Sequence, residues 1–406
     1  MVSRQISQGK SIFDSPLSFL GRREWLISFG SILAAALSNS KRLLTQELDE
    51  PMRMPGKKRL LVHNDYPEDL ETPLHYFDSW ITPQDVFFVR QHLPRPQVDE
   101  TSWRLTINGR VAEALSLNLS DLQQFPQVTV AATLECAGNG RGFFNPKVPG
   151  IPWTSGAIGN AQWKGIRLNE ILRHAGYNTQ STHVEFDGAD VGLAKTPDFV
   201  RSIPIAKAIH PSTLVALEMN GERLPAIHGF PARLIVPGWD GACWVKWLTR
   251  ITVRTAPTDG FFMKPAYRFP RHNVVPGNVA NPEDLQTIEG MQVKSVITSP
   301  QNDQRLAWGE SRIRGYAWAA EERIKSVEIS TDGGSRWTET QIVSPNQNFA
   351  WVLWEASWRP KSPGYTTIMS RATDTGGRVQ PIEATWNPSG YVWNAIDRVR
   401  VIVEER

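Results

Sequence analysis

Cysteine is scarce in this sequence, which contains only Cys136 and Cys243 among 406 residues. Two thiols are too few for a four-thiolate zinc site, an iron–sulfur cluster or a disulfide framework. No Cys-x-x-Cys-His run is present to attach a c-type haem, and the eight histidines lie far apart along the chain. Any metal bound by this chain therefore needs few protein ligands.

An excess of one charge is also lacking, because 44 lysines and arginines stand against 41 aspartates and glutamates, for a net charge of +3. This balance gives no sign of a nucleic-acid-binding surface, and we expect no nucleic-acid partner. With 40% hydrophobic and 21% charged residues, the composition is that of an ordinary folded protein and argues against a disordered chain. A chain of 406 residues exceeds a single core, so we expect two or three domains.

The N-terminal apolar run, Trp25 to Leu37, is too short to cross a bilayer core of about 30 Å, so we expect no stable membrane span. Arg22-Arg23 precede this run, and the small residues Ala34-Ala35-Ala36 stand near its end. This order predicts a removable signal over residues 1–40. The arginine pair resembles a twin-arginine export signal, which carries folded cofactor proteins out of the cytoplasm, and we therefore expect a periplasmic location. A packed amphipathic helix and an uncleaved anchor are the alternatives.

Glycine and proline are frequent, at 30 and 29 residues, and together with 16 tryptophans they indicate a β-rich, loop-rich fold. We expect an extended arm over residues 41–78 and a mixed α+β domain over residues 79–286. Within that domain, Asn108-Gly109 and Asn220-Gly221 predict hairpin turns. Residues 168–175 have helical spacing and are followed by Gly176, a good helix end.

Helical periodicity disappears from about residue 287 onward. Short strands then alternate with turns such as Asp332-Gly333-Gly334, which is typical of an immunoglobulin-like β-sandwich. The expected strands are 312–318, 324–330, 350–355 and 366–372. We therefore predict a second domain, a β-sandwich, over residues 287–406.

Cys136 ends an apolar strand and is followed at once by glycines and by Arg141. A thiolate at a glycine-rich turn is open to a bulky ligand. A nearby arginine lowers the pKa of a thiol and can pair with an anionic substrate. Metal ligation and nucleophilic catalysis both fit this segment, and a buried inert thiol is the alternative.

Three further segments place cationic or polar groups beside tight turns: Phe88–Pro94, His228–Gly238 and Gly241–Trp247. Together with the Cys136 segment, and in this order, they resemble the sulfite oxidase family of molybdenum-cofactor enzymes. The resemblance extends over roughly residues 75–403. It implies an α+β molybdopterin-binding domain followed by an immunoglobulin-like dimerisation domain, and hence a homodimer.

The same resemblance implies that Cys136 is the one protein ligand of molybdenum, whose other sulfur ligands come from the pterin dithiolene. It also implies that a set of charged and polar residues holds the pterin and its phosphate. These residues are Arg90, His92, Asp190, His228, Arg233, Trp244, Val245 and Lys246. Cationic side chains donate charge-assisted hydrogen bonds to phosphate, and a carboxylate accepts from pterin N–H groups. Asp187 lies close to Asp190 and is the alternative carboxylate.

The family's substrate pocket corresponds here to Arg90, Arg141, Trp153 and Tyr267. A small doubly charged oxyanion needs fixed guanidinium donors, and a tyrosine can donate to an oxygen or relay a proton. One departure concerns substrate choice. Animal sulfite oxidases carry an arginine in a Trp-Asn-x-Arg-Gly run, whereas residues 386–390 have Ser389 at that position. One substrate cation is therefore missing or supplied elsewhere.

Cys243 is a second departure, because the animal enzymes have an arginine in this part of the cofactor loop. We consider an inert packed thiol, a redox-sensitive group and a disulfide with Cys136. The disulfide is the ordinary fate of two cysteines in an exported protein, but it would consume the metal ligand.

The resemblance implies oxidation of sulfite to sulfate by oxo transfer. The family's fused haem domain, with its His-Pro-Gly-Gly run, has no counterpart in this sequence, so we expect electrons to pass to an external cytochrome c-type acceptor. Two alternatives stay open. One is a molybdenum oxidoreductase for nitrate or a sulfoxide, which Ser389 leaves open although Arg90 and Arg141 favour a small anion, and the other is a cofactor-free immunoglobulin-like binding protein.

Overall fold

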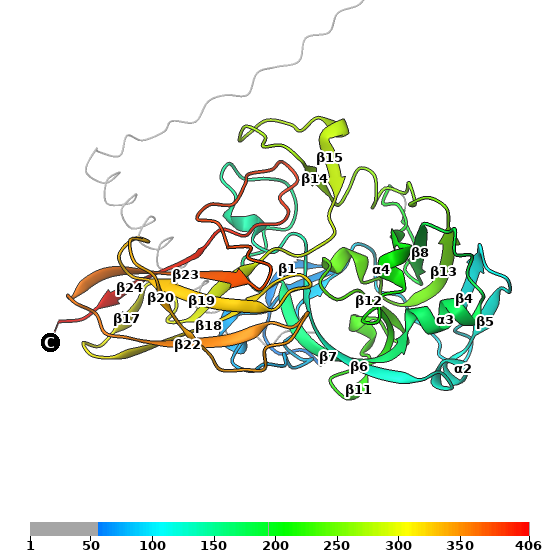
Figure 1. The fold of residues 1–406 in the computed structure, drawn as a ribbon, viewed down its shortest axis with the longest axis horizontal. Helices are drawn as coiled ribbons and strands as arrows, with labels where there is room; N and C mark the ends of the chain where they lie inside the picture. The colour runs from blue at the N-terminus through cyan, green and yellow to red at the C-terminus, as the bar shows by residue number, and fades with distance from the viewer. Residues whose placement is uncertain (1–55, 194, 406) are drawn as a thin grey trace, which may run out of the picture. The chain divides into compact units, whose positions relative to one another are not determined.

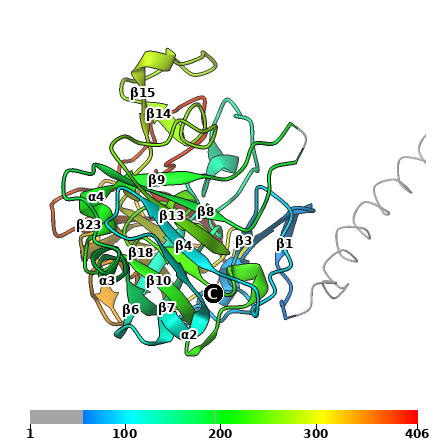
Figure 2. The same cartoon turned by 90° about the vertical axis from the view of Figure 1, so that its right-hand side faces the viewer.

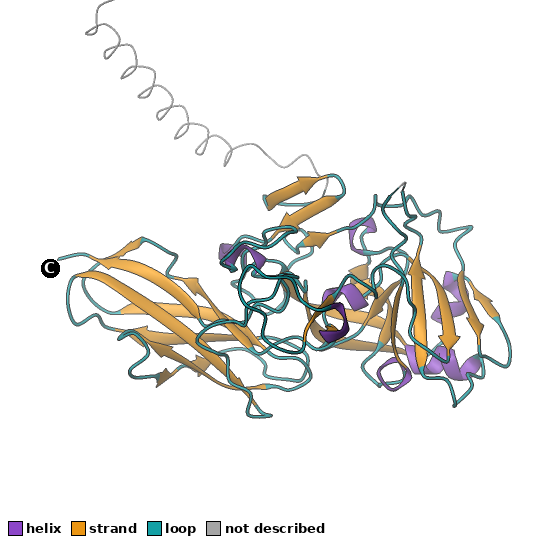
Figure 3. Cartoon of the chain, turned by 90° about the horizontal axis from the view of Figure 1, so that it is seen from above, coloured by secondary structure: helices purple, strands orange, loops and turns teal. Residues whose placement is uncertain are grey.

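The computed structural model describes residues 56–193 and 195–405, and Figure 1 shows their fold. The predicted signal, residues 1–40, and residues 41–55 of the predicted arm lie outside the described residues. Strands dominate, and the helices are few and short (Figure 3). The described α-helices are α2 (Leu119–Gln123), α3 (Leu168–His174) and α4 (Ile205–Ala208). Within the described residues, no helix is long and apolar enough to cross a membrane.

Two five-stranded sheets form the core of the first domain, defined here as residues 61–254. One sheet has the strand order β11-β10-β7-β6, and β12 also pairs with β10. Its strands are β6 (Gln127–Glu135), β7 (Ile158–Arg167), β10 (Leu214–Met219), β11 (Glu222–Arg223) and β12 (Arg233–Ile235). The pairing of β6 with β7 runs to Glu135 opposite Ile158. Cys136 therefore follows directly at the end of a fully paired strand.

The other sheet of the first domain has the order β5-β4-β13-β8-β9. Its strands are β4 (Leu105–Gly109), β5 (Leu115–Leu117), β8 (His183–Gly188), β9 (Arg201–Pro204) and β13 (Leu248–Arg254). Strand β13 runs parallel to β4 and antiparallel to β8 (Figure 2). Ile107, Trp163, Ile171 and Leu234 are fully buried members of one hydrophobic cluster, so both sheets and α3 share a core.

Helix α3 confirms the helix predicted over residues 168–175. Leu168, Ile171 and Leu172 lie on its buried face, as the helical spacing requires. Gly176 adopts φ +64°, the left-handed conformation that favours glycine just beyond a helix end.

Of the two predicted hairpin turns, Asn220-Gly221 is confirmed, because Met219 pairs with Glu222 across these two residues. The turn at Asn108-Gly109 is wrong in position. Strand β4 continues through both residues, since they pair with β13, and the chain turns only at residues 110–114 before β5. Pairing with a neighbouring strand thus outweighs the local turn preference of the Asn-Gly pair.

The described part of the predicted arm is more regular than an extended segment. It forms β1 (Leu61–Asp65) and β2 (Glu68–Glu71), which join β3 (Val89–Arg90) in a three-stranded sheet. All four residues of β2 are buried, including Asp69 opposite Arg90. The sequence hides this strand because three of its four buried residues are acidic, and these three lie against basic side chains rather than in an apolar core.

The second domain, defined here as residues 294–403 and called the sandwich domain, confirms the predicted β-sandwich. One sheet has the order β16-β18-β22-β21, with β16 (Lys294–Ser299), β18 (Ser311–Trp318), β21 (Gln341–Ile342) and β22 (Val352–Trp358). The other has the order β17-β24-β23-β19-β20, with β17 (Gln304–Leu306), β19 (Ile324–Ser330), β20 (Thr338–Glu339), β23 (Gly364–Asp374) and β24 (Asp397–Val403). Ile313, Val327 and Ile368 belong to the buried cluster between the sheets.

Residues between the two domains form the hairpin of β14 (Arg268–Pro270) and β15 (Leu285–Thr287). The domains themselves meet at a buried hydrophobic cluster that includes Ile158, Tyr316 and Trp318. The Trp318 indole donates to the Glu135 carboxylate at 2.9 Å. The sandwich domain therefore contacts the first domain at the residue that precedes Cys136.

Candidate functional site

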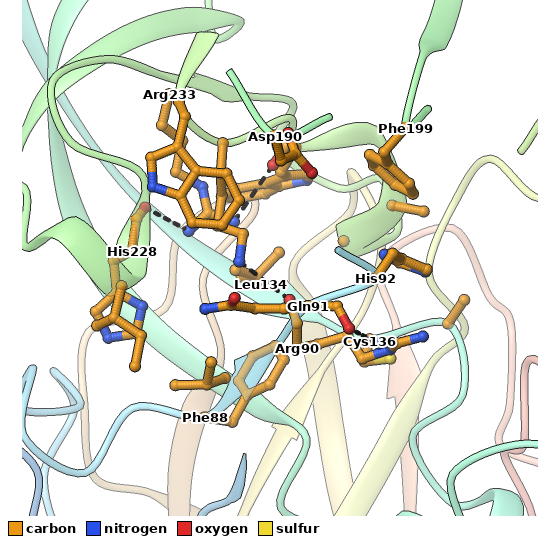
Figure 4. Close-up of a pocket in the computed structure, with 18 of the residues that line it drawn as sticks. Phe88, Arg90, Gln91, His92, Leu134, Cys136, Asp190, Phe199, His228 and Arg233 are labelled. Atoms are coloured by element: carbon orange, nitrogen blue, oxygen red, sulfur yellow. Dashed lines mark hydrogen bonds between the residues drawn. The ribbon is translucent and has the colours of Figure 1, made fainter. Parts of the chain in front are cut away.

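A cavity opens in the first domain where the segment after β3, the end of β6 and the loops around β12 meet (Figure 4). Nine of the twelve predicted site residues line it: Arg90, His92, Cys136, Asp190, His228, Arg233, Trp244, Lys246 and Tyr267. These residues come from distant parts of the sequence, and the fold brings them together.

Cys136 lies at the cavity with its side chain buried and only 8% of the residue exposed. Its backbone N–H donates to Ala157 at 2.9 Å, which continues the pairing of β6 with β7 by one residue. Burial raises the pKa of the Cys136 thiol, whereas Arg141 and Arg90 oppose that rise. A cysteine binds a metal as its thiolate, and the guanidinium groups of Arg141 and Arg90 favour this form.

Residues of the sandwich domain contact the loop that follows Cys136 and fix its backbone. Gly140 adopts φ +88°, and a Cβ there would lie 2.5 Å from Cδ1 of Trp393. Only glycine permits this close approach. The Val392 N–H donates to the Ala137 carbonyl at 3.0 Å, so the backbone beside Cys136 has little freedom.

Arg90 lies beside Cys136 and is fixed by a buried ion pair with Asp69, at 3.0 Å between Nη1 and Oδ1. Although burial opposes the charged form, Tyr267 and Asp69 hold the pKa of Arg90 above its ordinary value. Lys246 donates to the Arg90 carbonyl at 3.1 Å. A permanent positive charge therefore lines the cavity next to Cys136.

His92 and Tyr267 form a close contact at the cavity wall, with 2.5 Å between Nε2 and the phenol oxygen. The His92 ring stacks on Phe199 with 4.4 Å between centroids. Burial and the nearby Arg90 lower the pKa of His92 well below its ordinary value, and burial raises the pKa of Tyr267. Both groups are therefore neutral near pH 7, and the contact can hold or pass one proton.

Arg233 and His228 lie at the other end of the cavity from Cys136 and Arg90 (Figure 4). Arg233 donates to the carbonyls of His228 and Trp244, at 3.1 and 3.4 Å. Burial lowers the pKa of Arg233 to about 9, and among the described residues no carboxylate forms an ion pair with it. A buried cation without an anion is costly, so this end of the cavity suits a phosphate.

Lys246 and Asp190 lie close enough to influence each other's ionisation. Burial and Arg233 lower the pKa of Lys246 to about 7, against the effect of Asp190. Burial raises the pKa of Asp190 to about 6, against the effect of Lys246. Asp187, the alternative carboxylate, pairs instead with Arg250 on β13 and does not line the cavity. The structure thus places Asp190 rather than Asp187 at the site.

The residues of the cavity fit a molybdenum–pterin cofactor. Both amide atoms of Gln91 and Nε of Arg233 are buried without a hydrogen-bond partner, and both residues line the cavity. Such atoms are costly unless a bound group satisfies them. Pterin N–H and carbonyl groups complement the Gln91 amide, and phosphate complements Arg233. No group of three or more possible metal-ligating side chains occurs in residues 56–193 and 195–405.

Gln91 and Lys57 are residues that our sequence analysis did not single out. Lys57 lies 2.7 Å from Nε2 of His228 and donates to the carbonyls of Gln84 and Phe87, at 2.6 and 2.8 Å. Lys57 therefore connects the start of the described chain to the end of the cavity that Arg233 and His228 line, here called the phosphate end. The basic run at residues 57–59 is its only signal in the sequence, and such runs are usually solvated.

Three predicted site residues do not line the cavity. Arg141 backs the loop after Cys136, since it donates from Nε to Gly390 at 3.0 Å. Trp153 is fully buried, and its indole nitrogen has no partner. Val245 accepts a backbone hydrogen bond from Leu234 at 2.8 Å, which supports the loop rather than the cavity. Substrate contact by Arg141 and Trp153 and cofactor contact by Val245 stay predictions.

Cys243 is a free, buried thiol, as is Cys136, so no disulfide joins them. Its sulfur lies 3.6 Å from Nη2 of Arg201 and 3.8 Å from Oδ2 of Asp240. Burial, with a further contribution from Asp240, raises the pKa of Cys243 to about 12. This environment is that of an inert packed thiol.

The buried neutral His228 should make the cofactor-free protein sensitive to acid. Burial and Lys57 hold the pKa of His228 well below its ordinary value of 6.5. Below about pH 6.5 the unfolded chain therefore binds a proton here that the folded chain does not, and stability falls as pH falls. The free energy of unfolding of wild type should drop, relative to His228→Gln, by about 1 kcal/mol between about pH 6.5 and about pH 5.5, because an unfolded histidine is half protonated at the first pH and almost fully at the second.

Urea unfolding of both cofactor-free proteins at about pH 6.5 and about pH 5.5 measures this difference. Comparison with the variant is necessary, because carboxyls with raised pKa values, such as Asp190, shift stability in the opposite direction. Parallel pH profiles for the two proteins would show that His228 is not held neutral.

Comparisons with known proteins agree with this site. Residues 92–262 match the family model "Oxidoreductase molybdopterin binding domain", and residues 285–404 match "Mo-co oxidoreductase dimerisation domain". The mitochondrial sulfite oxidase of Rattus norvegicus is 36% identical over 87% of this chain and 67% of its own length. The sulfite oxidase of Arabidopsis thaliana is 34% identical over 86% of this chain and 95% of its own. The solved structure of the sulfane dehydrogenase SoxCD from Paracoccus pantotrophus is similar, with TM-score 0.74 and 30% identity over 88% of this chain and 94% of that one.

The fold and the site define a molybdopterin-dependent oxidoreductase with a dimerisation domain. The chain belongs to the sulfite oxidase family. The predicted cofactor, the molybdenum–molybdopterin group, and the predicted α+β domain followed by a sandwich are confirmed. The alternative of a cofactor-free binding protein is thereby wrong.

Proposed function

We propose that this protein oxidises sulfite to sulfate. The observation that carries the proposal is the single cavity that joins the predicted metal ligand Cys136, the permanent charge of Arg90 and the proton-holding pair of His92 and Tyr267. When bound, the cofactor supplies two-electron oxygen-atom transfer. In balance, sulfite and water give sulfate, two electrons and two protons.

The chain's own residues bind the anion and handle its protons. Arg90 replaces part of the hydration of sulfite with fixed donors, because its guanidinium is already oriented by Asp69. Tyr267 donates to an anion oxygen or passes a proton to His92. Phe199 and the other buried aromatics of the wall exclude water, which strengthens these contacts.

A second candidate substrate is sulfane sulfur. Ser389 stands where the animal enzymes have an arginine, and the sulfane dehydrogenase from Paracoccus pantotrophus is 30% identical over 88% of this chain. A substrate that spreads its charge over more atoms than sulfite needs fewer cations around it. Nitrate, with one negative charge, and a neutral sulfoxide also need fewer cations than sulfite and remain alternatives.

A substrate panel on the molybdenum-loaded enzyme with an artificial electron carrier tests the proposal. We expect turnover of sulfite to exceed that of thiosulfate, nitrate and a sulfoxide by at least about tenfold in kcat/KM. A preference for thiosulfate or another sulfane compound would replace sulfite by the second candidate.

The proposal extends to partners and location. An external cytochrome c-type acceptor takes the two electrons one at a time, and two copies associate through the sandwich domain, which matches a dimerisation model. The Arg22-Arg23 segment directs the folded enzyme to the periplasm. This segment lies outside the described residues and supports the proposal by its sequence alone.

Arg141→Gln should raise the KM for sulfite about tenfold, because one positive charge near the anion is lost. Arg141 lies within electrostatic reach of Cys136 without lining the cavity, so its charge attracts the anion from behind the loop. Ionic strength should weaken capture less in the variant than in wild type. Steady-state kinetics, normalised to molybdenum, measure both effects. An unchanged KM and an unchanged salt dependence would mean that Arg141 only supports the loop.

A further inference from the structure

A segment of the sandwich domain, residues 387–393, returns to the loop that follows Cys136. The Asn387 side chain fixes it by donating to the Tyr391 carbonyl at 3.0 Å and accepting from the Tyr391 N–H at 3.2 Å. Val392 adopts φ +55°, which is rare for a β-branched residue and persists only where the surroundings impose it. Its N–H is bonded to Ala137 at 3.0 Å. Tyr391 is therefore held at one place beside the metal-ligand loop.

Tyr391 belongs to a cluster of two aromatic rings and two arginine side chains. Its ring stacks on that of Tyr267, with 5.4 Å between centroids and 19° between planes. The guanidinium of Arg141 lies 4.9 Å from the centroid of the Tyr391 ring, and that of Arg201 lies 5.0 Å from the centroid of the Tyr267 ring. Each of the two stacked phenols thus has a guanidinium over its ring, and the electron-rich ring face attracts that cation.

Both partners of Tyr391 matter to the site already described. Tyr267 carries the hydroxyl that contacts His92 in the cavity. Its backbone adopts φ +55°, an unfavourable conformation for a tyrosine, which persists only where the surroundings impose it. Arg141 favours the thiolate of Cys136. Tyr391 contacts both residues at once, although it lines no part of the cavity itself.

We propose that Tyr391 is a positioning residue for substrate binding: its ring holds Tyr267 and Arg141 in place, so that the sandwich domain completes the substrate site. This inference rests on the proposed oxidation of a small anion. It also concerns the run Trp386–Gly390, in which Ser389 replaces the arginine of the animal enzymes. In this chain the same turn contributes no cation of its own and instead fixes Arg141, through the Gly390 carbonyl at 3.0 Å and the ring of Tyr391.

The test compares Tyr391→Leu, which removes the ring, with Tyr391→Phe, which keeps it. For Tyr391→Leu we expect KM for sulfite to rise about tenfold, with kcat per molybdenum falling by less, because two held contacts are loosened together. Tyr391→Phe, which keeps the ring, should have the KM of wild type. Tyr365→Leu is a matched control, since Tyr365 also lies against an arginine, Arg400, in the same domain but is 72% exposed. It should leave KM unchanged.

Crystal structures of the loaded variants give a second readout that does not depend on the substrate. The Tyr267 hydroxyl should leave His92 in Tyr391→Leu and stay in Tyr391→Phe. If wild type does not oxidise sulfite, the proposed function fails, and the structures still decide the role of Tyr391. An unmoved Tyr267 with an unchanged KM in Tyr391→Leu would overturn the inference. So would equal defects in both variants, because these would assign the effect to the hydroxyl rather than the ring.

Discussion

Replacing Cys136 by serine should leave a folded protein whose turnover per molybdenum is lower by at least about 100-fold. Loss of a residue that only supports a metal ligand costs up to about 100-fold, and loss of the ligand itself should cost at least as much. A serine alkoxide is a harder and less electron-donating ligand than a thiolate, and serine must lose a far less acidic proton to bind. Arg90 and Arg141 favour the thiolate of Cys136. The same two charges cannot lower the pKa of a serine hydroxyl far enough for it to ionise near neutral pH. The pterin itself should be retained in part, because the phosphate end of the cavity is unchanged.

Cys243→Ser is the matched control for this experiment. Cys243 is the other buried thiol of the described residues, and it lies against Arg201 and Asp240 rather than in the cavity. A serine hydroxyl can keep both contacts, so turnover per molybdenum should stay within about twofold of wild type. Equal activity of Cys136→Ser and wild type would remove Cys136 as the metal ligand. Equal loss in both variants would point to general damage to the fold.

Replacing Arg233 by methionine should lower the pterin content of the purified protein at least about tenfold, because a phosphate would lose its buried, charge-assisted donor. The cofactor-free protein should behave differently. Arg233 has no carboxylate partner among the described residues, and burial lowers its pKa to about 9. Removing an uncompensated buried charge costs little, so the free energy of unfolding of the cofactor-free protein should change by about 1 kcal/mol or less.

Arg201→Met supplies the contrast. Arg201 is also fully buried, but Asp240 and Cys243 raise its pKa against the effect of burial. Its removal leaves the buried carboxyl of Asp240 without the nearby positive charge of Arg201, and removing one of two buried opposite charges typically costs about 3–5 kcal/mol. The pterin content of the purified proteins measures the effect on cofactor binding. Urea unfolding of the cofactor-free proteins measures the effect on stability. A large loss of stability in Arg233→Met, with pterin content unchanged, would assign Arg233 to the fold and not to the cofactor.

Much of the cofactor site could be predicted from the sequence, because its residues stand in short runs beside glycine-rich turns. Arg90, Cys136 and Arg233 are of this kind, and all three line the cavity. The strand ends and turns that carry them depend on local patterns, which a single sequence displays. Helix α3 and most strands of the sandwich domain were predictable for the same reason.

The supporting residues could not be predicted, because their roles arise only from contacts across long distances in the chain. Lys57 meets His228 across 171 residues. Tyr391 of the sandwich domain meets Tyr267, which lies between the two domains, across more than 100 residues. Neither Tyr391 nor Ser389 carries a local sequence signal for that contact. Asp69 was missed because a buried acidic strand has no apolar pattern. At Arg141 the motif predicts substrate contact, and this stays a prediction, because the side chain donates to the Gly390 carbonyl and does not line the cavity.

The central claim is that this cavity oxidises sulfite at a molybdenum held by Cys136, and anaerobic single turnover tests it most directly. The loaded enzyme is mixed with excess sulfite and no electron acceptor, and sulfate is measured against molybdenum. We expect one sulfate per molybdenum in wild type, because the site can accept two electrons once. Cys136→Ser, at the same molybdenum content, should form almost none on the same timescale. No sulfate above the protein-free control from wild type, while a sulfane compound is oxidised under the same conditions, would contradict the claim.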